Sequence, residues 1–370
     1  MEFYYVLSED ERTATCYYDD RWEERGGKLL RYEKDHGYWL FYRFKHLKKV
    51  AFDATCRSAS FDCTEGWFYD CSKLEEITGL ENLNTGKVKS MRSMFFGCST
   101  LSALDLSSFD TTQVKDMSTM FSGCSALTAL DLSSFQTTHV ENMSAMFRSC
   151  SSLKTLDLSS FNVSAVRQMK EMFSGCSALI ALDLSSFQTT RVENMSAMFS
   201  GCSSLKTLDL SSFNGSAVVY VDDMFADCTA LAHLDLSYFN PKNAWSSERM
   251  FFNCRELTTI YCKAIWDCGC SEGMFEDCRK LRGAVLYDFT RTDVEMANPE
   301  TGYFSSEEPN LSLSETAPEA APEKKEDPAN NEEQMTPNEF VNCSFFTMQG
   351  VPLEGGVADL PAGMYLMKKD

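Results

Sequence analysis

Hydrophobic and polar positions in this chain follow a pattern that repeats every 26 residues. The block LDLSSF, which ends the series as LDLSYF, returns at that step at 104–109, 130–135, 156–161, 182–187, 208–213 and 234–239. Each copy follows a Met-Phe-x-x-Cys block. A fixed period of this length is typical of a solenoid, in which every repeat forms one coil that stacks on its neighbours.

Two kinds of spacing lie within one repeat. Leu104 and Leu106 alternate with Asp105, which predicts a short strand with one apolar face. The rest of the repeat spaces its apolar residues three or four apart, as in a helical turn or two. These residues are Val114, Met117, Met120, Phe121 and Cys124. The sequence therefore predicts an α/β repeat: a leucine-rich-repeat-type solenoid with a parallel strand ladder and short helical returns.

Residues 1–46 do not repeat and are rich in aromatic and β-favouring residues. Strands are predicted at Phe3–Leu7, Thr13–Tyr18 and Tyr38–Phe44, with a turn at Gly26-Gly27. Because a solenoid needs covered ends, we expect a small N-terminal β cap here.

The solenoid is predicted to span residues 47–304, with its last strand at Leu281–Phe289. Residues 305–338 contain five of the nine prolines and many acidic residues, which is typical of a disordered linker. Residues 339–370 are apolar again. They predict a short C-terminal β segment, with strands in 345–350 and 360–366 around glycine-rich turns.

The formal net charge of −20 argues against nucleic acid and anionic membranes as partners, since both select basic surfaces. No run of about 20 apolar residues predicts a transmembrane segment. The start, MEFYYVLSEDER, lacks the features of a secretory signal peptide. The protein therefore either stays inside the cell or is exported by a signal outside this sequence.

Nine of the sixteen cysteines occupy one position of the repeat. We name them the cysteine row: Cys71, Cys98, Cys124, Cys150, Cys176, Cys202, Cys228, Cys254 and Cys278. Neighbours in register have parallel Cα–Cβ bonds, a poor geometry for disulfides, and free cysteine packs as a small hydrophobic residue. We expect reduced, buried thiols.

Cys262, Cys268 and Cys270 fall outside this row, and with Cys278 they raise the question of a metal site. They lack paired C-x-x-C units and no histidine lies nearby, which disfavours zinc. A local disulfide fits better in an oxidising compartment. We expect no metal and no cofactor.

The polar side of the LDLSSF blocks repeats an aspartate at every coil. We name this set the aspartate row: Asp105, Asp131, Asp157, Asp183, Asp209 and Asp235. Serines follow two positions later, at Ser107, Ser133, Ser159, Ser185 and Ser211. On a parallel sheet these carboxylates would lie about 4.8 Å apart and repel. They form either an acidic face for a basic partner or divalent cations, or a solvated face whose aspartates accept hydroxyl hydrogen bonds.

No catalytic grouping stands out. The four histidines are scattered at His36, His46, His139 and His233. Residues 121–172 and 173–224 match at 42 of 52 positions, and Arg191 takes the place of His139 in the second copy. Neither a G-x-x-x-x-G-K-[ST] nor an H-E-x-x-H motif occurs. We expect no catalytic residue.

The phrases CSSLKTLDLSSFN and VENMSAMF resemble the BspA-like leucine-rich-repeat surface proteins of Bacteroidetes and other host-associated microbes, over about residues 47–304. This resemblance implies a cell-surface or secreted adhesin that contacts host matrix proteins, mucin, other glycans or other cells. It supplies no catalytic residues. The tail from Phe345 to Lys369 is similar to part of a type IX secretion sorting sequence, but stops before its usual second strand. An alternative function is a structural scaffold or spacer that self-associates through its near-identical coils.

Overall fold

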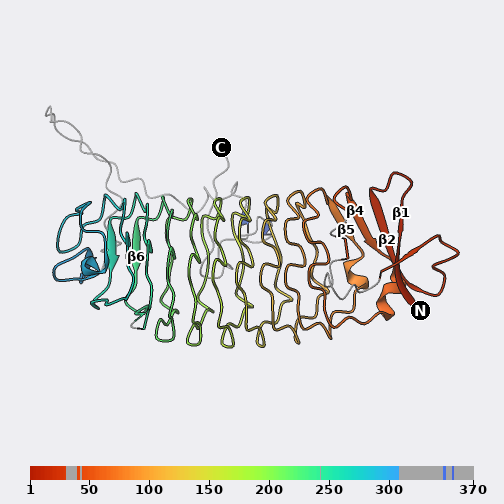
Figure 1. The fold of residues 1–370 in the computed structure, drawn as a ribbon, viewed down its shortest axis with the longest axis horizontal. Helices are drawn as coiled ribbons and strands as arrows, with labels where there is room; N and C mark the ends of the chain where they lie inside the picture. The colour runs from red at the N-terminus through yellow and green to blue at the C-terminus, as the bar shows by residue number, and fades with distance from the viewer. Residues whose placement is uncertain (31–39, 42–43, 242, 308–344, 347–351, 354–370) are drawn as a thin grey trace, which may run out of the picture. The chain divides into compact units, whose positions relative to one another are not determined.

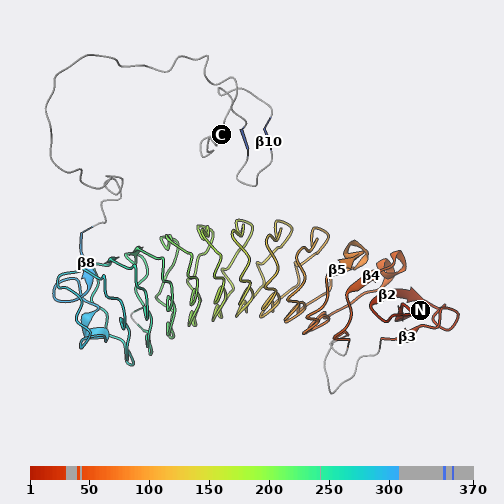
Figure 2. The same ribbon diagram turned by 90° about the horizontal axis from the view of Figure 1, so that it is seen from above.

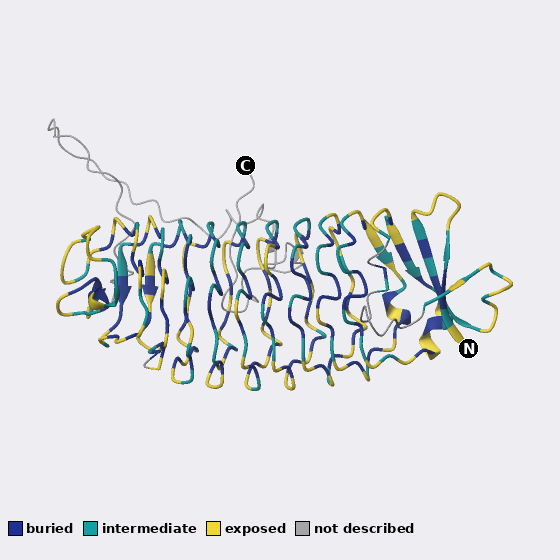
Figure 3. Ribbon diagram, in the orientation of Figure 1, coloured by how far each residue is buried: buried dark blue, intermediate teal, exposed yellow. Residues whose placement is uncertain are grey.

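The chain winds into successive coils that stack from β1 to β8 (Figures 1 and 2). The computed structural model describes residues 1–30, 40–41, 44–241, 243–307, 345–346 and 352–353. It divides into two units, Met1–Leu311 and Ser312–Asp370. Apolar side chains fill the inside of the coils and exposed residues gather at their turns (Figure 3). The expectation of a leucine-rich-repeat-like solenoid is confirmed, and two details of the coil were wrong.

The first correction concerns the helical returns. Every second residue from Met117 to Gly123 donates its backbone N–H to the next coil, as Thr119 does to Ser144 O at 2.8 Å and Phe121 to Met146 O at 2.9 Å. The residues between them close tight turns, such as Met120 N to Met117 O at 3.3 Å. An α-helix needs those same N–H groups for carbonyls four residues back, so none forms.

These turns require left-handed backbone at two positions of each coil. Thr119 has a φ of 56° and Gly123 a φ of 77°, and the equivalent residues of most other coils also have positive φ. The apolar spacing still predicted burial correctly, because Met117, Met120 and Phe121 are fully buried. The only helices among the described residues are short 3₁₀ turns: η1 Ala54–Ser58, η2 Leu80–Asn82 and η3 Val294–Met296.

The second correction concerns the strand ladder. The five LDLSSF blocks are not strands, and a parallel ladder of isolated bridges instead joins one residue of each coil at Cys63, Ser90, Asp116, Asn142, Gln168, Asn194, Tyr220, Ser246 and Cys270. Side chains form hydrogen bonds with the backbone N–H and C=O groups that would otherwise pair the strands of a sheet. Ser133 N donates to Asp131 Oδ1 at 2.9 Å, and the Ser134 hydroxyl donates to Leu106 O at 3.1 Å.

Phenylalanine rings stack along the core from coil to coil. Phe121 and Phe147 are nearly parallel, with ring centroids 5.7 Å apart and planes at 7°. The stack runs through Phe41, Phe68, Phe95, Phe121, Phe147, Phe173, Phe199, Phe225, Phe251 and Phe275. Burial of these rings is a major source of the solenoid's stability, because no single coil can cover its own apolar face.

The N-terminal cap extends the solenoid rather than standing apart from it. A five-stranded sheet has the order β3-β1-β2-β4-β5. Its strands are β1 Glu2–Leu7, β2 Thr13–Asp19, β3 Lys28–Leu29, β4 Lys49–Phe52 and β5 Glu76–Thr78. β1 and β2 are antiparallel, whereas β2 pairs in parallel with β4, the first coil.

The expected turn at Gly26-Gly27 is present, with Gly26 at a φ of 62°. The expected strand at Tyr38–Phe44 was wrong where it can be checked: Leu40, Phe41 and Phe44 are not in a strand, and the rest lies outside the described residues. β3 pairs with β1 at the edge of the cap sheet.

A loop closes the C-terminal end of the solenoid. Each coil donates N–H groups to the next, so the last coil needs other acceptors. Gly273 N donates to Asp293 Oδ1 at 2.9 Å, Phe275 N to Thr292 O at 2.8 Å, and Asp277 N to the Tyr287 hydroxyl oxygen at 3.0 Å. The exposed edge of this coil is thereby satisfied.

The expected last strand at Leu281–Phe289 was wrong: this segment has only one bridge, between Arg282 and Leu286, and belongs to the closing loop. The last parallel sheet is formed by β6 His233–Asp235, β7 Thr259–Tyr261 and β8 Phe304–Ser305.

In the second unit, β9 Phe345–Phe346 pairs antiparallel with β10 Pro352–Leu353. The strand expected in 360–366, and the predicted linker beyond residue 307, lie outside the described residues. Among the described residues, no helix is long and apolar enough to cross a bilayer.

Candidate functional site

The aspartate row is exposed, and each aspartate shapes the turn that follows it. In every coil Oδ1 accepts the backbone N–H two residues later, at 3.0 Å from Ser107 to Asp105 and at 2.8 Å from Ser211 to Asp209. The other four coils make the same bond. This is an Asx turn, which holds each carboxylate in one orientation on the surface.

At Asp105 and Asp131, hydrogen bonds have a larger effect on the pKa than repulsion between neighbouring carboxylates. The backbone N–H and hydroxyl of Ser133 hold the pKa of Asp131 below its usual range, and the charge of Asp105 opposes this with a smaller effect. The hydroxyl and N–H of Ser107 lower the pKa of Asp105 in the same way. Asp105 and Asp131 are therefore ionised at neutral pH, and the Asx turns orient the whole row.

The predicted cysteine row is present. All nine residues are buried and unpaired. Each thiol of the regular coils donates to a phenylalanine carbonyl of the preceding coil, as Cys150 does to Phe121 O at 3.2 Å. Burial raises the pKa of Cys124 and of Cys176 to about 12, so these thiols are protonated and unreactive at neutral pH.

The irregular cysteines and the histidines form no common site. Cys262 and Cys268 are buried, Cys270 is half-buried, and all three are unpaired. Within the described part of the chain, no group of three or more His, Cys, Asp and Glu residues could hold a metal ion. His139 Nδ1 lies 3.0 Å from Thr112 O and His233 Nδ1 lies 3.2 Å from Thr258 Oγ1.

His46 faces Glu11 at 3.8 Å in the N-terminal part of the chain, and His36 lies outside the described residues. The described histidines therefore contact different parts of the chain and do not converge.

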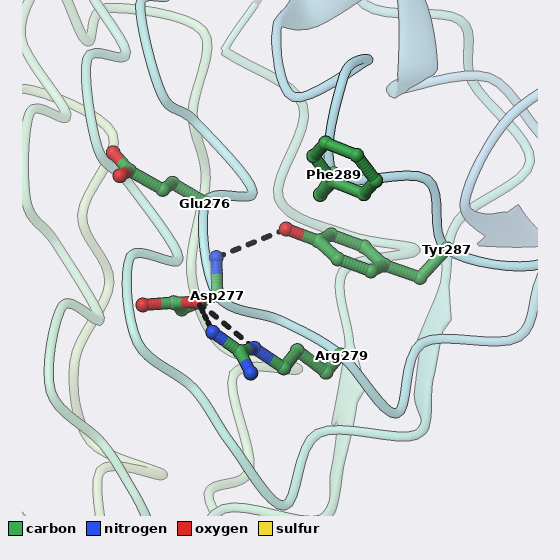
Figure 4. A pocket seen from close by; sticks show the side chains of 5 residues that line it. All are labelled: Glu276, Asp277, Arg279, Tyr287 and Phe289. Atoms are coloured by element: carbon green, nitrogen blue, oxygen red, sulfur yellow. Dashed lines mark hydrogen bonds and ion pairs between the residues drawn. The ribbon is translucent and has the colours of Figure 1, made fainter.

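A cleft of about 550 Å³ lies where the last coil meets the closing loop (Figure 4). We name it the C-terminal cleft; it is lined by Glu276, Asp277, Arg279, Tyr287 and Phe289. Arg279 donates to Asp277 Oδ1 from Nη2 at 2.7 Å and from Nε at 3.0 Å. Phe289 is 82% exposed. The cleft thus combines an aromatic surface with a guanidinium–carboxylate pair.

The family described as "Mycoplasma protein of unknown function, DUF285" matches residues 63–182 and 177–286, which together make up more than half of the chain. The chain belongs to the DUF285 family. Its matched region coincides with the stacked coils, from the bridge at Cys63 to the bridged residue Leu286.

Solved structures similar to this DUF285 chain include leucine-rich-repeat proteins. One from T. pallidum is 18% identical, with a TM-score of 0.36, over 62% of this chain and 87% of that one. A leucine-rich cell surface protein from Faecalibacterium prausnitzii is 17% identical, with a TM-score of 0.30, over 81% and 97%. The functional domain of InlJ from Listeria monocytogenes, which includes a cysteine ladder, is 15% identical, with a TM-score of 0.20, over 69% and 53%.

A comparison with curated proteins finds no match.

Sequence reasoning found the aspartate and cysteine rows of this DUF285 chain but missed the C-terminal cleft. It assigned Tyr287 and Phe289 to a strand, whereas they belong to the closing loop. One signal was available: the residue before the row cysteine is glycine in most regular coils and becomes Asp227, Asn253 and Asp277 in the last three.

Proposed function

We propose that this DUF285 chain is a non-enzymatic binding protein of the cell surface or extracellular space. Its ligands are host matrix proteins, mucin or other glycans, or the surfaces of neighbouring cells. The observation that carries the proposal is the aspartate row, an exposed set of carboxylates repeated at the coil spacing and oriented by their own turns. The BspA-like resemblance of the coils supports the surface location, and the similarity of the tail to part of a type IX sorting sequence supports export by that route.

The row suits a partner with basic groups at a matching spacing. Each carboxylate is held by a local hydrogen bond, so a partner orders little of the surface when it binds. Repetition of one contact along the array gives multivalent binding, in which weak individual contacts add up. The net charge of −20 adds long-range attraction for a basic partner, weakened by salt.

The test is a binding array of extracellular-matrix proteins, mucins and glycans at physiological salt, probed with the whole chain. The matched control changes all six aspartates of the row to asparagine, which keeps the Asx turns and removes the charge. We expect at least one protein ligand whose binding falls ten-fold or more in the variant. Protein binding that is equal in both chains would move the site away from the row, and the absence of any ligand would contradict the proposal.

Self-association as a scaffold is the second candidate. The match of 42 in 52 positions between neighbouring coil pairs favours it, because similar coils can stack across chains. The closing loop argues against it, since it already supplies acceptors for Gly273, Phe275 and Asp277. Light scattering that shows a monomer over a wide concentration range would exclude the scaffold.

A further inference from the structure

The last three coils differ from the regular ones beside the cysteine row, at one surface position in all three and at a second in the last two. The residue before the cysteine is Gly97, Gly123, Ser149, Gly175 and Gly201 in the regular coils. In the last three coils it is Asp227, Asn253 and Asp277, and the residue after the cysteine changes from serine or threonine to Arg255 and Arg279 in the last two. We name these five residues the polar row.

The polar row forms two hydrogen-bonded groups, one of Asp227, Asn253 and Arg255 and one of Asp277 and Arg279. Asn253 Nδ2 donates to Asp227 Oδ1 at 2.5 Å, and Arg255 Nε donates to Asn253 Oδ1 at 2.5 Å. Arg279 binds Asp277 through two nitrogens. Two carboxylates and two guanidiniums balance in charge, while each side chain keeps further donor or acceptor capacity toward solvent. The surface is therefore rich in hydrogen-bonding groups without a net charge of its own.

The polar row ends at the C-terminal cleft, which Tyr287 and Phe289 line together with Asp277 and Arg279 (Figure 4). Tyr287 is anchored, because its hydroxyl accepts the backbone N–H of Asp277. The Phe289 ring is 82% exposed and leaves a large apolar surface in water. Apolar area exposed at a cleft with convergent polar groups is typical of a ligand site, and about 550 Å³ lies within the usual range.

We propose that the C-terminal cleft and the adjoining polar row bind a neutral oligosaccharide. This inference rests on the proposed binding function and names one ligand class and its place. A pyranose ring has an apolar C–H face and an edge of hydroxyls that both donate and accept. The C–H face packs on the Phe289 ring, and neighbouring hydroxyls donate to Asp277 and accept from Arg279.

Charged ligands fit this surface less well. An isolated cation would compete with Arg279 for Asp277, and an isolated anion would face Glu276 in a chain of net charge −20. A neutral ligand leaves the Asp277–Arg279 pair intact. Further sugar units along the same glycan reach Asn253 and Arg255 on the preceding coil, about 4.8 Å away.

The experiment uses the whole chain against immobilised maltotriose, mannotriose, chitotriose and N-acetyllactosamine, with sialyllactose and polylysine as charged comparators. Two variants test the site. Phe289→Ala removes the exposed ring, and Asp277→Gly installs the residue of the regular coils at a position whose φ is 61°, where glycine is unstrained. Leu286→Ala is the matched control, because Leu286 is 74% exposed in the same loop but does not line the cleft.

We expect binding of at least one neutral oligosaccharide, weakened ten-fold or more by Phe289→Ala and by Asp277→Gly and unchanged by Leu286→Ala, with thermal melts showing all variants folded. Oligosaccharide binding that both variants retain would overturn the site. Binding of polylysine or sialyllactose alone would overturn the ligand class. A chain that binds matrix proteins through the aspartate row but no oligosaccharide overturns this inference and leaves the proposed function intact.

Discussion

The Sγ atom of Cys124 lies 3.1 Å from the carbonyl oxygen of Phe95 in the preceding coil and donates its hydrogen to it. The same carbonyl accepts the N–H of Cys98 at 3.2 Å, so both of its lone pairs are used. One small side chain therefore fills space in the core and ties two coils together, which explains why cysteine suits this position.

Replacing Cys124 with alanine is expected to destabilise the fold by about 1–3 kcal/mol, since it removes a buried sulfur and its hydrogen bond. Urea unfolding under reducing conditions measures this loss. Cys270→Ala is the control, because Cys270 is half-buried and outside the row, and it should change stability by less than about 0.5 kcal/mol. Equal effects at the two positions would show that the hydrogen-bonded row has no special role.

Stability should fall at alkaline pH because of these thiols. Burial raises the pKa of Cys124 and Cys176 from 9.0 to about 12. Above pH 9 the thiols ionise in the unfolded chain but stay protonated in the folded one, which favours unfolding. The free energy of unfolding is therefore unaffected below pH 9 and falls between pH 9 and about 12, by about 1.4 kcal/mol per thiol for each pH unit. Urea unfolding at pH 8, 9 and 10 with reductant tests this. The double variant Cys124→Ala, Cys176→Ala should show a shallower decline, and an identical decline would contradict the assignment.

The aspartate row permits a three-way comparison in one coil. Asp157→Asn is expected to change stability by less than about 0.5 kcal/mol, because asparagine can accept the same N–H of Ser159, which lies 2.9 Å away. Asp157→Ala loses that bond and should cost about 1 kcal/mol. Leu156→Asp places an unpaired charge in the core and should unfold the middle coils. Thermal melts rank the stabilities of the three variants. If Asp157→Asn were as destabilising as Asp157→Ala, the negative charge itself would be needed for stability.

The period and the burial pattern could be predicted from the sequence, but the routing of hydrogen bonds could not. Leu106 and Met117 are buried as their spacing predicts. Spacing does not say whether a backbone N–H bonds within its coil or to the next. In this fold the carbonyl groups of neighbouring coils accept the N–H hydrogen bonds, so apolar residues are spaced as in a helix although no helix forms. The C-terminal cleft depends on Phe289, which breaks the usual rule that large apolar residues are buried, and no local pattern marks such an exception.

The closing loop is expected to protect the edge of the last coil. Tyr287→Phe removes the oxygen that accepts the N–H of Asp277, and Asp293→Ala removes the acceptor of Gly273 N–H. The double variant leaves two donors of the last coil without a protein acceptor, so hydrogen exchange at Asp277 and Gly273 should speed up while the middle coils stay protected. The open edge also becomes available to a second chain, and light scattering should show more association for the double variant than for the unchanged protein. If the double variant remains monomeric with unchanged exchange, the loop does not protect this edge and the end of the solenoid is closed by packing alone.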